Sequence, residues 1–77
     1  MKMVCIRERV AQYVGDILQS PSIFRRMYEE YLSEGYVTDL LPGCVILRLD
    51  DGEIHFVWKN GLIVEQVYSY RANQQVG

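Results

Sequence analysis

Three evenly spaced turns constrain the fold of the C-terminal half of this chain. Each turn is a dipeptide that ends in glycine: Pro42-Gly43, Asp51-Gly52 and Asn60-Gly61. The dipeptides are nine residues apart, and an apolar-rich run of seven residues separates each from the next. Asp-Gly and Asn-Gly between such runs are strong hairpin signals, because a two-residue type I′ turn needs positive φ at both central positions. Pro-Gly suits a type II turn, in which Gly takes the left-handed position. The spacing therefore predicts an antiparallel meander with strands over 44–50, 53–59 and 62–70.

Two-residue loops also determine which residues of the meander lie opposite one another. One face is expected to carry three cross-strand rows: Leu49–Ile54–Val67, Leu47–Phe56–Glu65 and Val45–Trp58–Ile63. All of these side chains except Glu65 are apolar, so this face is expected to pack on helices. A slip of one residue would turn the whole set to solvent, and the choice of face is therefore strongly specified.

The N-terminal half predicts two helices. Apolar residues recur at helical spacing over 3–19, at Met3, Ile6, Val10, Val14 and Ile17. Ser20-Pro21 suits the first positions of a second helix over 21–34, and Gly35 suits its left-handed end. A strand over 36–41 is left open, because Thr38-Asp39 breaks its apolar pattern. The expected fold is an α+β single domain over 1–77, with two N-terminal helices packed on one face of a three- to four-stranded antiparallel meander.

The opposite face of the meander has no helix left in the sequence to cover it. The expected register groups apolar side chains at one end of this face, and the last strand adds two tyrosines; together they are Ile46, Val57, Leu62, Val64, Tyr68 and Tyr70. A contiguous exposed apolar patch marks an interaction site, and tyrosine is enriched at interfaces. If the last strand is an edge, it can also add to another sheet. We therefore expect a partner-binding surface here.

Arginines on the expected helices suggest a second kind of contact. Arg25 and Arg26 occupy the first turns of the second helix, where their charge opposes the macrodipole, although each has a glutamate four residues later. They form either a solvated helix face or a contact for an acidic partner or phosphate. Together with Arg7 and Arg9 they also allow a nucleic-acid-binding regulator. A net charge of −2 and evenly spread charges argue against broad binding to a phosphate backbone.

The sequence contains no pattern typical of catalysis or of metal binding. His55 is the only histidine, and its nearest carboxylates, Asp50 and Glu53, lie toward a turn. Cys5 and Cys44 lack metal-ligand spacing and are expected to be free thiols in a reducing compartment. We expect no catalytic residue, no metal, no cofactor and no small-molecule substrate.

The expected location is the cytoplasm. Arg7-Glu8-Arg9 interrupts any hydrophobic region of a signal peptide, and no apolar run approaches the length of a membrane span. In size and in its lack of chemical motifs the chain resembles small accessory proteins of phages and other mobile elements.

These observations favour a small non-enzymatic protein-interaction module. We expect a regulator or inhibitor that binds a protein partner through the exposed sheet face and the last strand, and that forms a homodimer. The alternatives are a small nucleic-acid-binding regulator that uses the helix arginines and a subunit of a structural homo-oligomer.

Overall fold

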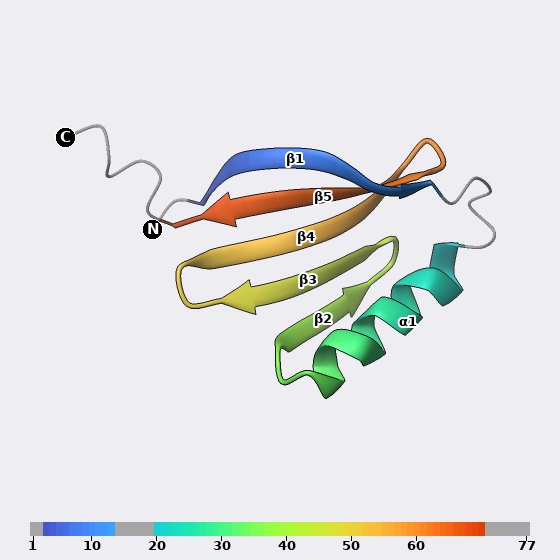
Figure 1. Cartoon of the computed structure of the whole chain (residues 1–77), viewed down its shortest axis with the longest axis horizontal. Helices are drawn as coiled ribbons and strands as arrows, with labels where there is room; N and C mark the ends of the chain where they lie inside the picture. The colour runs from blue at the N-terminus through green and yellow to red at the C-terminus, as the bar shows by residue number, and fades with distance from the viewer. Residues whose placement is uncertain (1–2, 14–19, 71–77) are drawn as a thin grey trace.

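The protein is built on one antiparallel sheet. The computed structural model describes residues 3–13 and 20–70. In these residues five strands lie in the order β1-β5-β4-β3-β2, and one helix packs against them (Figure 1). The elements are β1 (Val4–Tyr13), α1 (Ser20–Ser33), β2 (Val37–Leu41), β3 (Cys44–Leu49), β4 (Gly52–Lys59) and β5 (Leu62–Ser69).

The expected pair of helices is wrong, and the fold is mostly β. Residues 4–13 form β1, which pairs antiparallel with β5. The register of this pairing shifts between Cys5 and Arg7 and again between Val10 and Gln12. Each shift inserts a residue, so that side chains on one face recur at uneven intervals instead of every second residue. A bulged strand of this kind can imitate helical spacing. Residues 14–19, the remainder of the expected helix, lie outside the described residues.

The helix α1 ends in a Schellman motif, as Gly35 leads one to expect. Gly35 has a φ of 97°, and its N–H donates to the carbonyl of Leu32 at 3.1 Å. The N–H of Tyr36 donates to the carbonyl of Tyr31 at 3.2 Å, and the two tyrosine rings meet edge to face at 5.8 Å. These bonds satisfy carbonyls at the helix end and turn the chain directly into β2. With 14 residues, α1 is too short and too polar to cross a membrane.

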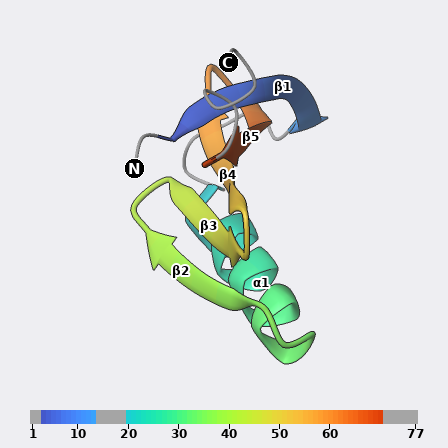
Figure 2. The same cartoon turned by 90° about the vertical axis from the view of Figure 1, so that its left-hand side faces the viewer.

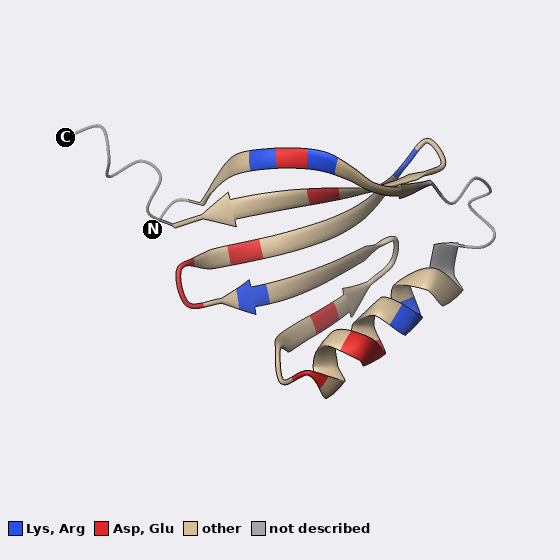
Figure 3. Cartoon of the chain, in the orientation of Figure 1, with Lys and Arg blue, Asp and Glu red and all other residues tan. Residues whose placement is uncertain are grey.

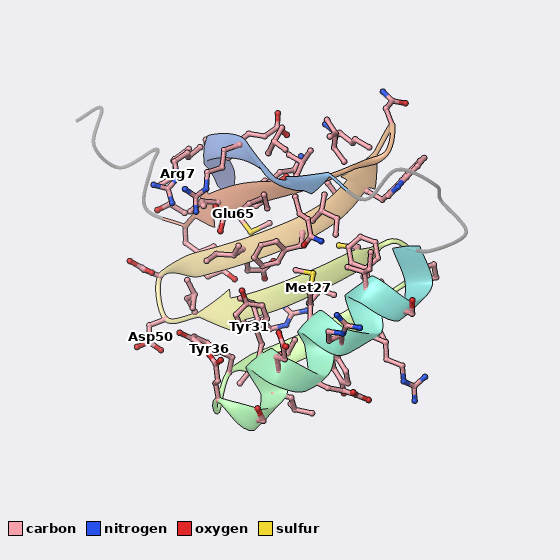
Figure 4. All side chains as sticks on the ribbon, turned by 45° about the vertical axis from the view of Figure 1, so that its right-hand side comes forward. Arg7, Met27, Tyr31, Tyr36, Asp50 and Glu65 are labelled. Carbon is pink, nitrogen blue, oxygen red and sulfur yellow. The ribbon has the colours of Figure 1, made fainter. Side chains whose placement is uncertain are left out.

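The core lies between α1 and one face of the sheet, which we call the helix-covered face. Its buried residues are Phe24, Val45, Leu47, Phe56 and Ile63. The ring of Tyr31 stacks on Phe56 at 5.8 Å, and Figure 4 shows Tyr31 and Met27 on the side of α1 that meets the strands. Figure 2 shows α1 beside β2 and β3, with β1 at the far end of the twisted sheet. We call the other side of the sheet the open face, because no helix of the described residues covers it.

The register of β4 and β5 is the expected one, and that of β3 and β4 differs by two residues. Asn60 and Gly61 have positive φ, as a type I′ turn requires, and Trp58 pairs with Ile63. The preceding turn is made by Asp50 and Asp51 instead of Asp51-Gly52, so that Leu49 pairs with Gly52. A shift of two residues leaves every side chain on its expected face.

The last strand is not an edge, because β5 lies between β1 and β4. Glu65, the polar exception on the helix-covered face, is consequently flanked on both sides. Its side chain is 13% exposed and accepts a hydrogen bond from Nε of Arg9 on β1 at 2.6 Å. An ion pair therefore joins β1 to β5 at this position.

Candidate protein-binding edge

The sheet ends in two edge strands, of which β1 is poorly suited to pair with another strand. Its ten residues contain two register shifts. Arg7, Glu8 and Arg9 place three consecutive charges along it, visible as alternating colours in Figure 3. Bulges and charges are the features by which proteins keep a free edge from pairing. The β1 edge is therefore protected.

The β2 edge lacks these features. Its five residues pair with β3 without a register shift, and Asp39 is the one charged residue among them. The Asp39 carboxylate is bound by Arg48, whose Nη2 lies 2.6 Å and whose Nε lies 2.8 Å from Oδ2. Two nitrogens of Arg48 thus bind one oxygen of Asp39, and this ion pair offsets part of the negative charge, since Arg48 also binds Glu53. β2 is consequently a short and regular edge whose single charge is paired.

Large apolar side chains are exposed along β2 and just before it. Val37 is 63% exposed, Leu40 38% and Leu41 47%. Tyr36 and Leu32, which precede the strand, are 41% and 47% exposed. We define the β2 edge as Val37–Leu41 together with Leu32 and Tyr36. Edge strands with exposed apolar side chains are sites at which another strand can add.

Among residues 3–13 and 20–70, no strand pairs with the outer side of β2, whose main chain still carries hydrogen-bonding groups there. Leu41 and Cys44 pair across the two-residue turn at 42–43, and such a closing pair exchanges both of its hydrogen bonds. Hydrogen-bonding residues alternate along an antiparallel strand, so Val37 and Asp39 also bond to β3. Thr38 and Leu40 must then direct their N–H and C=O groups away from β3, toward the free edge.

The structure brings the six residues of the expected partner surface onto or near the open face, but leaves them little exposed. Ile46, Val57 and Leu62 are half-buried, and Val64 is only 6% exposed. The two tyrosines are half-buried as well. The hydroxyl of Tyr68 donates to Oε1 of Gln66 at 3.1 Å, and that of Tyr70 donates to Oε2 of Glu53 at 2.9 Å. The most exposed apolar side chains thus lie at the sheet edges instead.

Glu53 is the centre of a polar cluster on the open face. It is 8% exposed. Its Oε2 accepts a hydrogen bond from Nη1 of Arg48 at 2.8 Å, in addition to that from Tyr70, and its Oε1 accepts one from Nε2 of His55 at 2.8 Å. The hydrogen bond from His55, supported by that from Tyr70 and by the positive charge of Arg48, lowers the pKa of Glu53 although burial opposes this. The buried carboxylate of Glu53 therefore has hydrogen-bond donors for both of its oxygens.

The same face carries a second group of polar contacts toward β1. Nε2 of Gln66 donates to Oε2 of Glu8 at 2.6 Å, and Nζ of Lys59 lies 3.5 Å from the same oxygen. The hydrogen bond from Gln66 is the main reason that the pKa of Glu8 is lowered. The ring of His55 lies 4.5 Å from that of Tyr68, next to Gln66. His55 thus has an acidic partner, Glu53, although the sequence placed the nearest carboxylates toward a turn. The expectation that the chain is not an enzyme stays a prediction.

Two of the four arginines lie on a helix as expected, and the other two lie on a strand. Arg25 lies on α1 and pairs with Glu29 at 3.5 Å, whereas Arg26 is exposed on the same helix. Arg7 and Arg9 lie on β1, at the opposite end of the sheet (Figure 3). The positive charges are consequently divided between two elements, and two of the four arginines are engaged in ion pairs.

The two cysteines are free thiols in different surroundings. Cys5 is exposed on β1, and Cys44 is half-buried on β3. Burial raises the pKa of Cys44, which makes its reactive thiolate form rarer. Within residues 3–13 and 20–70, no group of three or more histidine, cysteine or acidic side chains is placed to hold a metal ion.

No family model, curated protein or solved structure matches this chain. Its functional interpretation therefore rests on its own geometry. Val37, Leu40 and Leu41 were not among the expected binding residues, although the apolar residues before the turn at 42–43 could have indicated them. That β2 is an edge could not be read from the sequence, because it depends on β1 pairing with β5 at the other side of the sheet.

Proposed function

We propose that this chain is a small protein-interaction module that binds an extended segment of another protein along the β2 edge. The added segment would pair its main chain with Thr38 and Leu40 and would cover the exposed side chains of Val37 and Leu41. Main-chain pairing supplies affinity in this mode of recognition, and alternate side chains supply selectivity. A module of this kind regulates or inhibits its partner by binding a segment that the partner needs for another contact.

One observation carries the proposal, namely the contrast between the two edges of the sheet. The β1 edge has two register shifts and three consecutive charges. The β2 edge has no register shift, and its one charge is paired with Arg48. Both strands are edges of the same sheet, so being an edge does not by itself explain why only β1 is protected against pairing.

The chain offers a matched pair of variants to test this proposal. Val37 on β2 and Val10 on β1 are the same residue type, and they are exposed to 63% and 58%. Lysine on an edge strand disfavours pairing. The wild type, Val37→Lys and Val10→Lys would each be immobilised and used to capture proteins from an extract of the source cells. A specific partner is expected on the wild type and on Val10→Lys, and its amount should fall at least tenfold on Val37→Lys, a loss of about 1.4 kcal/mol.

Amide hydrogen exchange would then locate the contact on the module. Binding of the purified partner is expected to slow exchange at Thr38 and Leu40, whose N–H groups point away from β3. The amides of Val37, Asp39 and Leu41 should change less, because β3 already protects them. A partner that binds Val37→Lys as well as the wild type, or one that protects β1 instead, would refute the proposal.

A further inference from the structure

We infer that a second copy of this chain occupies the β2 edge when no other protein is bound there, so that two sheets join into one. The inference rests on the proposed function, because it takes β2 as the binding edge. It starts from the main-chain donors that the edge offers. Pro42 has no N–H, and the N–H of Tyr36 is bound to the carbonyl of Tyr31. The outward donors of this edge are thus those of Thr38 and Leu40.

These donors and their carbonyls are self-complementary in one antiparallel register. A twofold axis through Asp39 places Thr38 of each copy opposite Leu40 of the other. Both pairs then exchange two hydrogen bonds, which uses every outward N–H and C=O of the two residues. A register centred on Thr38 or on Leu40 turns part of these groups toward Tyr36 or Pro42, whose N–H groups are bound or absent. The backbone therefore selects the register centred on Asp39.

The side chains agree with this register. On the open face it places Val37, which is 63% exposed, opposite Leu41 of the second copy, which is 47% exposed, and this pair occurs twice. Asp39 lies opposite Asp39 of the second copy, and like charges directly opposite each other are unfavourable. Each Asp39 is held by its own Arg48 at 2.6 Å, however, so each carboxylate at the axis has a guanidinium group beside it. Because each Arg48 also binds Glu53, these ion pairs weaken the repulsion between the two Asp39 carboxylates without removing it.

The short edge makes this a weak association. A contact built on five residues of each β2 buries less than about 1,200 Å² in total, the size of transient complexes. We therefore expect the dimer to form at micromolar or higher concentrations. A foreign segment with better side-chain contacts can then displace the second copy, and the two occupants compete for the same main-chain groups.

A proline at position 40 tests the pairing without removing a hydrogen bond of the monomer. The N–H of Leu40 points outward, so Leu40→Pro deletes a donor that only an added strand would use, and proline is tolerated on edge strands in this orientation. Leu40→Ala loses the same side chain and keeps the N–H. Sedimentation over a hundredfold range of concentration is expected to show dimers for the wild type and Leu40→Ala. The dissociation constant of Leu40→Pro should be at least tenfold higher, with an unchanged circular dichroism spectrum.

Disulfide trapping tests the register. In a Cys5→Ser, Cys44→Ser background, Asp39→Cys would place two thiols opposite each other at a non-hydrogen-bonded position, where cross-strand Cβ atoms are closest. Val10→Cys on the β1 edge serves as the control for random collision. Asp39→Cys is expected to form covalent dimers at least tenfold faster than Val10→Cys.

Three outcomes would overturn the inference: a wild type that stays monomeric at every concentration, a Leu40→Pro variant that dimerises like Leu40→Ala, or Asp39→Cys trapping no faster than Val10→Cys. A monomeric wild type that still binds a partner sensitive to Val37→Lys would remove the second copy and leave the proposed function standing. A dimer sensitive to Leu40→Pro, combined with a partner that binds elsewhere, would support the inference and refute the proposed function.

Discussion

Gly52 on β4 lies against the main-chain carbonyl of Tyr68 on β5, and a Cβ atom at position 52 would collide with that oxygen. Since Gly52 does not have positive φ, close approach is the reason that glycine is needed here. The sequence suggested another reason, the conformation of a turn.

The substitution Gly52→Ala should therefore destabilise the fold strongly. The clash involves main chain on both sides and cannot be relieved by rotating a side chain, so a loss of about 2–4 kcal/mol in the free energy of unfolding is expected. Urea denaturation measures it. Gly43→Ala is the control, because Gly43 has a φ of 69° but open space around it, and about 1 kcal/mol is expected there. Equal losses for the two variants would contradict this account of Gly52.

Glu53→Gln should make stability less dependent on pH. The folded pKa of Glu53 is lowered from 4.5, so its charge stabilises the fold above that pH, and this stabilisation is lost as the pH falls through the folded pKa. At neutral pH, Glu53→Gln is expected to cost about 1–3 kcal/mol, because Arg48 and His55 lose a charged acceptor. The difference from the wild type should shrink as the pH falls through the folded pKa of Glu53, because the wild-type carboxyl then becomes neutral as well. Urea denaturation at neutral and at acidic pH tests this, and a difference that stays constant would contradict it.

Phe24→Ala should weaken the attachment of α1 to the sheet. Phe24 is 1% exposed and belongs to the core cluster, and truncation of such a side chain typically costs about 3–5 kcal/mol. Leu32→Ala, on the same helix but 47% exposed, should cost less than about 0.5 kcal/mol in dilute solution. Thermal unfolding followed by circular dichroism compares the two variants, and similar losses would show that α1 packs differently.

The two thiols should react at different rates with a thiol reagent such as a disulfide dye. Cys5 is exposed, whereas burial raises the pKa of Cys44 and shields it. A Cys44→Ser variant, which retains Cys5, is therefore expected to react at least tenfold faster than a Cys5→Ser variant under native conditions. In denaturant the two rates should converge, and a native ratio near one would contradict the burial of Cys44.

Local chemistry explains which features of the fold could be read from the sequence. Asn60-Gly61 takes positive φ in almost any context, so the turn and the register of β4 with β5 follow from a few adjacent residues. Gly35 likewise ends α1 by a motif that needs only its neighbours. His55, the only histidine, could be placed on its strand in the same way, but the shift of two residues at Asp50-Asp51 that brings Arg48 opposite Glu53 could not.

Whether residues 4–13 form a strand or a helix depends on the tertiary structure, and so does the choice of the strands that lie at the edges of the sheet. Residues 4–13 become a strand because β5, far along the chain at residues 62–69, supplies hydrogen-bond partners that outweigh a helical apolar pattern. This pairing places β5 in the interior of the sheet and leaves β2 as the regular edge. Short-range turns and the alternation of side chains between faces depend on neighbouring residues, and they could therefore be read from the chain. Which strand remains unpaired depends on long-range pairing, and no local pattern encodes it.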